Sequence, residues 1–313
     1  MAGTSHHHHI IGSGAVGQLI ACLLTTADIP NALVNRKNIS EEKTISYFPF
    51  SSSGQAEPVR LTLDYDALTD NTILDVVWVC VKSYQLESAL QLVKPQLNNN
   101  TILILTQNGM GHLETAQKLL CPTLPPEQIF VAVNTHGSLR VIDESLPELH
   151  HTGLGSLQIG NNYLVLNNQA KPLSLIKQVA SVINLSWHEQ IEMALWIKLG
   201  ISAVINPLTA YYQCKNGDLL TQTERQMETD MLIQEMESFY KAIDMEELAV
   251  TFKDDCYQVI KNTSNNFSSM MLDTKNGKQT EIESITGYLL SQANGVRLKM
   301  IGHQKQYHRI QKN

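Results

Sequence analysis

Short apolar runs alternate with segments of helical spacing along the first half of the chain. After Ile10–Ile11, the runs are rich in branched residues and carry few charges: Ala32–Val34, Val76–Val81, Thr101–Leu105 and Ile129–Val133. Such runs are typical of strands buried on both faces of a parallel sheet. Helical spacing lies between them, at Gly17–Thr26, Leu86–Leu97 and His112–Leu120. This alternation predicts an α/β fold with a doubly wound sheet.

The strand pattern disappears from about Glu189 onward. Helical spacing then covers Ile191–Tyr212, Thr221–Ala242, Met245–Lys261, Glu281–Ala293 and Arg297–Ile310. The length of 313 residues suits two domains of ordinary size. We therefore expect an α/β domain over residues 1–188 and an all-helical domain over residues 189–313.

One segment of the second half, Met193–Tyr212, has the length of a membrane span. It contains Lys198, Gly200, Asn206 and Pro207, whose combined insertion cost argues against a span. We interpret the segment as a helix buried on most sides within a soluble protein. Lys198 is then the one charge within an apolar stretch.

Composition and charge exclude several classes of function. The chain is 43% hydrophobic and 17% charged with a net charge of −7, which is typical of a globular protein and disfavours nucleic acid or an anionic membrane as partner. Five cysteines without a CxxC pair indicate buried thiols rather than a disulfide framework. The first residues lack the cationic start and apolar core of a signal peptide, so we expect a cytoplasmic protein.

Four consecutive histidines, His6–His9, precede the first apolar pair. Imidazoles bind transition metals, but an expression-tag remnant or a polar lead-in to the first strand is the simpler explanation, and we assign the run no function. Elsewhere we find no His/Cys/Asp cluster with the spacing of metal ligands. We therefore expect the reaction to need no metal.

A glycine-rich turn follows the first apolar pair: Gly12, Ser13, Gly14, Ala15, Val16 and Gly17. The pattern GxGxxG stands between a predicted strand and a predicted helix, which is the context that a dinucleotide site needs. Gly12 permits the tight turn, Gly14 lets a pyrophosphate approach the backbone, and Gly17 lets the helix pack against the strand. We expect a Rossmann-like dinucleotide-binding domain rather than a simple glycine-rich turn.

The residues after the second predicted strand indicate which dinucleotide binds. NAD sites usually carry a carboxylate there, but the chain reads Asn35-Arg36-Lys37. A guanidinium beside a second cation suits the 2′-phosphate of NADP(H), and a solvated pair of charges in a loop is the alternative.

Polar residues stand directly after two other strands. Lys82 follows Val76–Val81, and Asn108 lies shortly after Thr101–Leu105. Ligands of open α/β sheets bind beyond the carboxyl ends of the strands, so both side chains can contact a cofactor or substrate. The alternative is that each is an ordinary loop residue.

Lys198 is a candidate proton donor in the apolar helix. Desolvation lowers the pKa of an ammonium toward the range where it donates a proton at neutral pH. Ser202 and Asn206 follow at intervals of four residues and share its stripe of the helix. A lysine that reaches the surface or pairs with a carboxylate is the structural alternative.

Together these residues resemble the ketopantoate reductases (2-dehydropantoate 2-reductases), NADPH-dependent enzymes of the pathway to pantothenate and coenzyme A. The matching motifs run in family order from residue 10 to about 293: Gly12–Gly17, Val81–Ser83, Gln107–Gly111, Leu195–Leu199, Ile205–Ala210, Asn216–Gly217, Asn266–Met270 and Thr280–Glu283.

The resemblance implies a role for each matching residue. Lys198 falls on the general acid that protonates the carbonyl oxygen of the substrate. Arg36, Lys82, Asn108 and Glu281 fall on cofactor contacts, Glu281 beside the nicotinamide and its ribose. The substrate-binding positions that the resemblance implies are Asn108, Asn206, Asn216 and Ser269.

Two departures from the family pattern bear on function. The family commonly has Asn four residues after the catalytic lysine, where this chain has Ser202, which can still hydrogen-bond to a substrate. Members often carry a proline-containing loop before the last helix, but Ala293-Asn294-Gly295 leads directly into Val296-Arg297-Leu298. The loop is then shortened, or residues are missing from this segment.

Three functions are consistent with these patterns. The first is NADPH-dependent reduction of 2-dehydropantoate to (R)-pantoate, with the proton from Lys198. The second is the same chemistry on another branched 2-oxo acid, which Ser202 suggests. The third is a non-catalytic NADP-binding regulator, although a pure binder has no need of a buried proton donor. The expected partner is a small 2-oxo acid, with no nucleic acid and no membrane, and the chain is expected to be a monomer or a homodimer.

Overall fold

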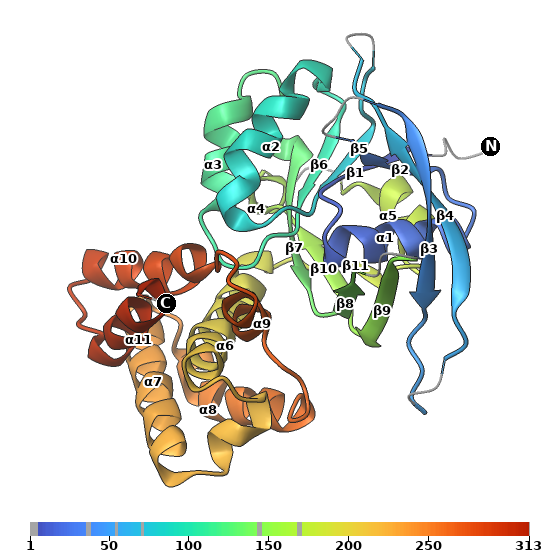
Figure 1. Ribbon diagram of the computed structural model, residues 1–313. Coiled ribbons are helices and arrows are strands. Elements are labelled where there is room, and N and C mark those ends of the chain that lie inside the picture. Colours follow the sequence, from blue (N-terminus) through green and yellow to red (C-terminus); the bar gives the residue numbers. More distant parts are fainter. Residues whose placement is uncertain are drawn as a thin grey trace. The chain divides into compact units, whose positions relative to one another are not determined.

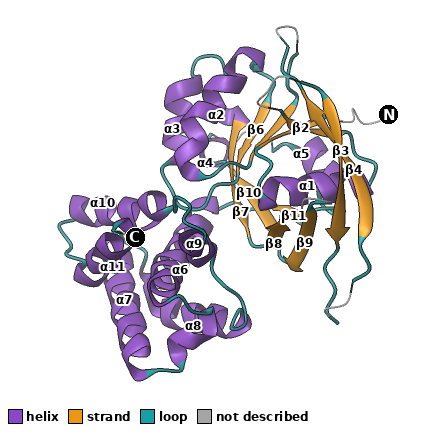
Figure 2. Ribbon diagram, viewed as in Figure 1, coloured by secondary structure: helices purple, strands orange, loops and turns teal. Residues whose placement is uncertain are grey.

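The computed structural model of the chain describes residues 6–35, 39–53, 56–69, 72–142, 146–167 and 171–312. The chain forms two compact units. The sheet unit comprises Met1–Gln107 and His112–Glu192, and the helical unit comprises Asn108–Gly111 and Met193–Asn313. Figure 2 shows that the strands all lie in the sheet unit. The segment Asn108–Gly111 thus belongs to the helical unit although it follows a strand of the sheet unit.

The described part of the sheet has eleven strands in the order β11-β10-β7-β6-β5-β1-β2-β4-β3-β9-β8. Their bounds are β1 His8–Ile11, β2 Asn31–Val34, β3 Glu41–Phe48, β4 Val59–Asp66, β5 Val76–Val79, β6 Ile102–Leu105, β7 Ile129–Asn134, β8 Gly137–Val141, β9 Glu148–Gly153, β10 Leu157–Gly160 and β11 Leu185–Trp187. The central block from β7 to β4 is parallel. Chain order reverses between β1 and β5, which is the switch point of a doubly wound sheet.

Helices cover both faces of this sheet, as Figure 1 shows for α1 and α5 on one side and α2 and α3 on the other. The sheet also curls, so that α1 packs against β4, β8 and β9 as well as β1 and β2. The helical segments of the unit are α1 Ala15–Thr26, α2 Leu86–Val93, α3 His112–Leu120, α4 Asn162–Leu166, α5 Leu173–Val179, and the 3₁₀ turns Ser83–Gln85, Lys94–Gln96 and Pro126–Gln128. The predicted Rossmann-like α/β class is therefore confirmed.

The five predicted apolar runs correspond to β1, β2, β5, β6 and β7, but the other six strands were not predicted. The histidine run enters the fold, because His8 and His9 are the first two residues of β1 and are buried. All five cysteines are free, and burial was expected for them. That expectation is wrong for Cys121, which is exposed.

The helical unit contains α6 to α11 and two shorter helical turns. Their bounds are α6 Ile191–Tyr212, the 3₁₀ turn Asn216–Leu220, α7 Thr223–Ala242, α8 Glu246–Asn262, α9 Ser269–Lys275, the π turn Glu283–Gly287, α10 Tyr288–Gly295 and α11 Ile301–Gln311. Helix α9 was not predicted. The last two helices start later than expected. Helix α10 follows the π turn, and α11 begins at Ile301. The turn between them contains Arg297, with a φ of 58°, and no proline.

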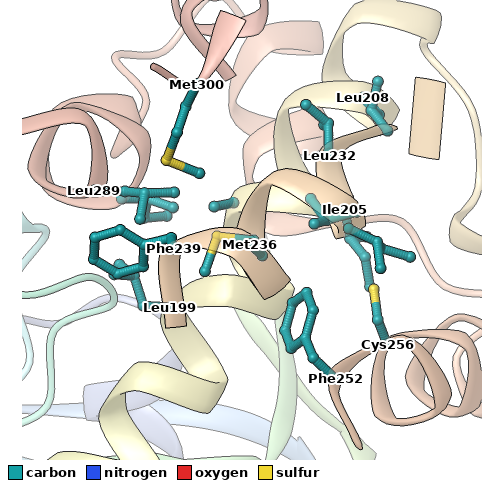
Figure 3. Close-up of a cluster of buried hydrophobic side chains, with 14 of the residues drawn as sticks. Leu199, Ile205, Leu208, Leu232, Met236, Phe239, Phe252, Cys256, Leu289 and Met300 are labelled. Carbon is teal, nitrogen blue, oxygen red and sulfur yellow. The ribbon is translucent and has the colours of Figure 1, made fainter. Parts of the chain in front are cut away.

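A hydrophobic core lies between α6, α7, α8 and α10 (Figure 3). The labelled side chains include Leu199, Ile205 and Leu208 from α6, and Phe239 from α7. Helix α6 is long and apolar enough by composition to cross a membrane, with a hydropathy of 1.4 over its most apolar window. Because its buried face forms this core, α6 serves as the central helix of the unit.

The closest approach of α6 to its neighbours is at Gly200. A Cβ atom there would overlap the hydroxyl of Tyr240 and lie 2.9 Å from Cε2 of Phe252. Tyr240 is fully buried, and its hydroxyl donates a 2.8 Å hydrogen bond to the carbonyl oxygen of Trp196. The glycine therefore sets how deeply α6 packs, two residues from Lys198.

We expect Gly200→Ala to lower the free energy of unfolding by up to about 2 kcal/mol. Overpacking costs about 1–3 kcal/mol, and the helix propensity of alanine offsets about 1 kcal/mol of that. The measurement is urea denaturation followed by circular dichroism. Gly295→Ala is the matched control, because a Cβ at Gly295 meets no atom within 4 Å. Equal stability of the two variants would show that the contact at Gly200 is not tight.

Candidate active site

The glycine turn of the sheet unit joins β1 to α1. Gly12 has a φ of +108°, and a Cβ there would lie 2.9 Å from the carbonyl group of Cys80 and the backbone nitrogen of Val81. A Cβ on Gly17 would overlap the carbonyl oxygen of Gly12. Both positions need glycine, because the turn presses against the end of β5 and α1 presses against the turn.

Gly14 differs from these two glycines, since a Cβ there would meet no protein atom within 4 Å. It is the N-cap of α1, and neither Gly14 nor Ser13 is covered. The first N–H groups of a helix have no partner within the helix and carry partial positive charge. The first turn of α1 holds no acidic residue. The open space at Gly14 thus fits the pyrophosphate of a dinucleotide.

Two cationic residues flank this turn. Lys82 follows β5 and caps the 3₁₀ turn Ser83–Gln85, directly after the backbone that Gly12 contacts. Arg140 of β8 donates a hydrogen bond of 3.2 Å from Nη1 to the carbonyl oxygen of Ser13. Sequence reasoning missed Arg140, because only the sheet pairing brings β8 over α1.

Arg36, the other cation expected at the cofactor site, lies outside the described residues. The chain on either side of it is held together by Asn35, whose Nδ2 donates to the carbonyl oxygen of Ile39 at 2.7 Å and to Oε1 of Glu41 at 2.9 Å. The adenosine ribose of a dinucleotide lies at this end of β2 in Rossmann-like folds.

Lys198 lies in the middle of α6 and is partly buried. Burial lowers the pKa of its ammonium from 10.5 to about 8, and the negative charge of Glu281 offsets part of that effect. Ser202 and Asn206, both partly buried, follow on the same stripe of α6. Pro207, next to Asn206, has no N–H to donate within the helix, which continues to Tyr212.

Glu281 and Asn108 complete a polar group in the helical unit. Glu281 is 5% exposed, and its Oε2 accepts a hydrogen bond of 3.3 Å from Nδ2 of Asn108. A buried carboxylate needs such partners, because an isolated charge is strongly disfavoured in an apolar environment. Lys198, Glu281 and Asn108 therefore provide an ammonium of lowered pKa, a carboxylate and an amide within one unit.

Two further expected residues have different surroundings. Asn216 is buried, with Nδ2 donating to Oγ1 of Thr263 at 2.8 Å and the backbone nitrogen donating to the carbonyl oxygen of Asn266 at 3.0 Å. Its Oδ1 is buried without a hydrogen-bond partner. The Asn216 side chain thus fastens the segment before α9 and leaves an unused acceptor.

Ser269 is exposed as the first residue of α9. The serine before it, Ser268, caps that helix by accepting from the backbone nitrogen of Met271 at 3.1 Å. Its Oγ also lies 2.7 Å from Oγ1 of Thr209 on α6, and both residues are buried. Sequence reasoning missed this link between α6 and α9, although the Ser-Ser pair before an apolar helix is a capping signal.

One group among the described residues can hold a metal ion. A ligand atom from each of His7, His9 and Asp66 lies within 4.8 Å of the others. Nδ1 of His7 and Nε2 of His9 are 3.1 Å apart and hydrogen-bond to each other. Nδ1 of His8 accepts from Nε1 of Trp78 at 2.9 Å, so the histidine run contributes to the packing at β1.

Comparison with known proteins identifies the family. The model for ketopantoate reductase PanE/ApbA matches residues 8–163, and the model for its C-terminal domain matches residues 190–311. A 2-dehydropantoate 2-reductase from Vibrio cholerae is 33% identical over 292 residues, 90% of this chain and 88% of that protein. The probable 2-dehydropantoate 2-reductase from Bacillus subtilis has a crystal structure that matches with a TM-score of 0.76 at 26% identity, covering 98% of this chain and 99% of that one.

A solved structure of D-mandelate dehydrogenase with NADH and anilino(oxo)acetate has the same fold, with a TM-score of 0.81 at 16% identity over 97% of each chain. The similarity of this chain to the 2-dehydropantoate 2-reductases makes the protein an oxidoreductase. It belongs to the ketopantoate reductase PanE/ApbA family, as the sequence motifs predicted.

We expect Gly14→Val to abolish binding of NADPH and NADH while leaving the fold intact. The branched side chain would occupy the space of the pyrophosphate, whereas a Cβ at this position meets no protein atom within 4 Å. Intrinsic tryptophan fluorescence titrated with each dinucleotide gives the affinity, and thermal unfolding gives the stability. Unchanged affinity for NADPH would remove this turn from the binding site. Gly17→Val serves as the contrast, because it should reduce stability itself.

Proposed function

We propose that the chain reduces 2-dehydropantoate to (R)-pantoate with NADPH, in the cytoplasm. The observation that carries the proposal is Lys198, an ammonium of lowered pKa in an apolar helix beside Glu281 and Asn108. Family membership supports the reaction, and the open turn at Gly14 supports the dinucleotide. The expected cofactor residues are Gly12–Gly17, Lys82 and Arg36, with Asn108 and Glu281 contributed by the helical unit.

The reaction adds a hydride and a proton across a ketone. NADPH held by Gly12–Gly17, Lys82 and Arg36 would supply the hydride for the carbonyl carbon and would be oxidised to NADP⁺. Negative charge then develops on the carbonyl oxygen, and Nζ of Lys198 donates a proton to it. An ammonium placed at that oxygen is most useful in the transition state, where the charge is largest.

The neighbours of Lys198 have complementary tasks in this scheme. Glu281 favours the protonated form of Lys198, since its charge raises the pKa that burial lowers. Asn108 holds the Glu281 carboxylate through Nδ2 and orients it. Ser202 and Asn206 extend the stripe with a hydroxyl and an amide that can bind the polar groups of the substrate. Asn216 and Ser269 are the remaining expected substrate contacts.

A second substrate class is favoured by one residue, Ser202. The shorter side chain offers no amide and leaves more room on the stripe than the asparagine common in the family. The same fold in D-mandelate dehydrogenase accompanies a different 2-oxo acid ligand. Steady-state comparison of 2-dehydropantoate with other branched 2-oxo acids decides between them, and the higher kcat/KM identifies the substrate.

We expect Lys198→Ala to lower kcat by about 10²–10⁴-fold, the usual loss on removing a general acid. The affinity for NADPH should change little, since the dinucleotide turn lies in the sheet unit. Oxidation of NADPH measured by absorbance gives kcat, and Lys299→Ala, an exposed lysine of the same unit, is the control. A near-normal kcat would eliminate Lys198 as the donor and favour a binding protein without catalysis.

The pH dependence gives an independent test of the same group. The ammonium form donates the proton and predominates below its pKa of about 8. We therefore expect kcat/KM for the 2-oxo acid to fall on the alkaline side above about pH 8, well before an ordinary lysine would titrate. The falling limb should disappear in Lys198→Ala, and its persistence there would assign it to another group.

We expect Arg36→Ala to weaken NADPH binding by about 10–100-fold and NADH binding much less. The variant removes a charge-assisted partner of the 2′-phosphate and leaves the pyrophosphate turn intact. Equilibrium titration with each dinucleotide measures the ratio, with Arg60→Ala, an exposed arginine on β4, as the control. Equal losses for both dinucleotides would show that Arg36 does not contact the phosphate.

A further inference from the structure

A π turn begins two residues after Glu281 in the sequence of the helical unit. It spans Glu283–Gly287, and the backbone nitrogen of Tyr288 donates to the carbonyl oxygens of Glu283 and Ile285, five and three residues earlier. In an α-helix that nitrogen would donate to Ser284, four residues earlier. The π turn therefore leaves the carbonyl oxygen of Ser284 available to another donor.

That donor comes from the segment Asn108–Gly111. The backbone nitrogen of Met110 donates to the carbonyl oxygen of Ser284 at 3.0 Å. Gly109, with a φ of +89°, packs so closely that a Cβ there would overlap the same carbonyl oxygen. The two backbones are thus in direct contact, and glycine is required at position 109 for both conformation and space.

The side chain of Ser284 makes a second connection. Its Oγ lies 3.2 Å from the carbonyl oxygen of Asn108 and 3.2 Å from that of Glu281. A hydroxyl has one proton, so it is shared between these two acceptors or alternates between them. Ser284 therefore links the backbones of the two residues whose side chains meet at the Asn108–Glu281 hydrogen bond.

We infer that Ser284 is a positioning residue for the reduction, acting through Asn108 and Glu281 and contacting neither substrate nor cofactor. This inference rests on the proposed function. The hydrogen bond between Nδ2 of Asn108 and Oε2 of Glu281 is 3.3 Å, beyond the usual 2.7–3.2 Å. A bond at that length is lost after a small shift of either backbone, and the serine hydroxyl limits such a shift.

The π turn explains why this task falls on residue 284. In a regular α-helix the Ser284 carbonyl would accept from the backbone nitrogen of Tyr288, so that Met110 would have to share an acceptor already in use. π turns inside helices are frequent at functional sites for this kind of reason. Here the π turn accepts a hydrogen bond from the segment Asn108–Gly111, which follows β6 in sequence and belongs to the helical unit.

The first experiment is a double-mutant cycle with Ser284→Ala and Asn108→Ala. We expect Ser284→Ala to lower kcat for the 2-oxo acid about threefold to tenfold, the effect of losing one hydrogen bond. KM for NADPH and the melting temperature should stay unchanged. In the Asn108→Ala background the same substitution should have no further effect, because the Asn108–Glu281 hydrogen bond that Ser284 supports is already absent.

Controls separate positioning from general damage. Ser291→Ala, an exposed serine of α10, should leave kcat at the wild-type value. Ser284→Thr retains the hydroxyl and should recover most of the lost activity. An unchanged kcat in Ser284→Ala, or an equal loss in both backgrounds of the cycle, would overturn the inference.

The second experiment needs no substrate. Amide hydrogen exchange of the peptide containing Met110 should be about tenfold faster in Ser284→Ala than in the wild type or Ser291→Ala. The kinetic measurements use the best substrate in a panel of branched 2-oxo acids. Failure of 2-dehydropantoate alone would thus refute the proposed substrate, whereas unchanged exchange would refute the role of Ser284.

Discussion

The unfavourable burial of one ammonium governs the organisation of the helical unit. Lys198 stands in the apolar α6, where desolvation lowers its pKa to about 8. An isolated charge in such surroundings would be neutralised or would pull the helix toward water. The carboxylate of Glu281 prevents this and is itself held by Asn108. The tight packing at Gly200 keeps α6 in the position where this balance holds.

The elements predicted from sequence are those whose pattern is local and strong. β1, β2, β5, β6 and β7 are buried along nearly their whole length, and each contains an apolar run. β3 and β4 alternate or begin with exposed residues, such as the first four of β3, and are polar in sequence. β8–β11 lie toward the two ends of the sheet. Their pairing depends on contacts distant in sequence, which no local pattern records.

In the candidate site too, the residues with a local sequence pattern could be predicted, and those that depend on distant contacts could not. GxGxxG could be predicted because its spacing encodes backbone requirements at Gly12 and Gly17, and Lys198 because its charge is isolated in an apolar helix. Arg140, Ser268 and Ser284 could not be predicted, since each matters through a partner brought close by the fold. Helix periodicity at residues 281–293 even conceals the π turn, because one extra residue barely alters the apolar spacing. The resemblance to ketopantoate reductases indicated roles for Asn216 and Ser269. The structure adds the hydrogen bonds of Asn216 and the exposed position of Ser269 at the start of α9.

The discontinuity of the helical unit has a consequence for how this architecture can be divided or recombined. The segment Asn108–Gly111 is encoded within the sheet unit but belongs by its contacts to the other unit. A fragment that begins at Met193 therefore contains Lys198 and Glu281 but lacks Asn108. Exchange of whole halves between two related genes would pair that segment with a foreign π turn. The junction near residue 192 separates two compact units along the chain. Recombination at that junction would nevertheless separate Asn108 from the Glu281 that it contacts.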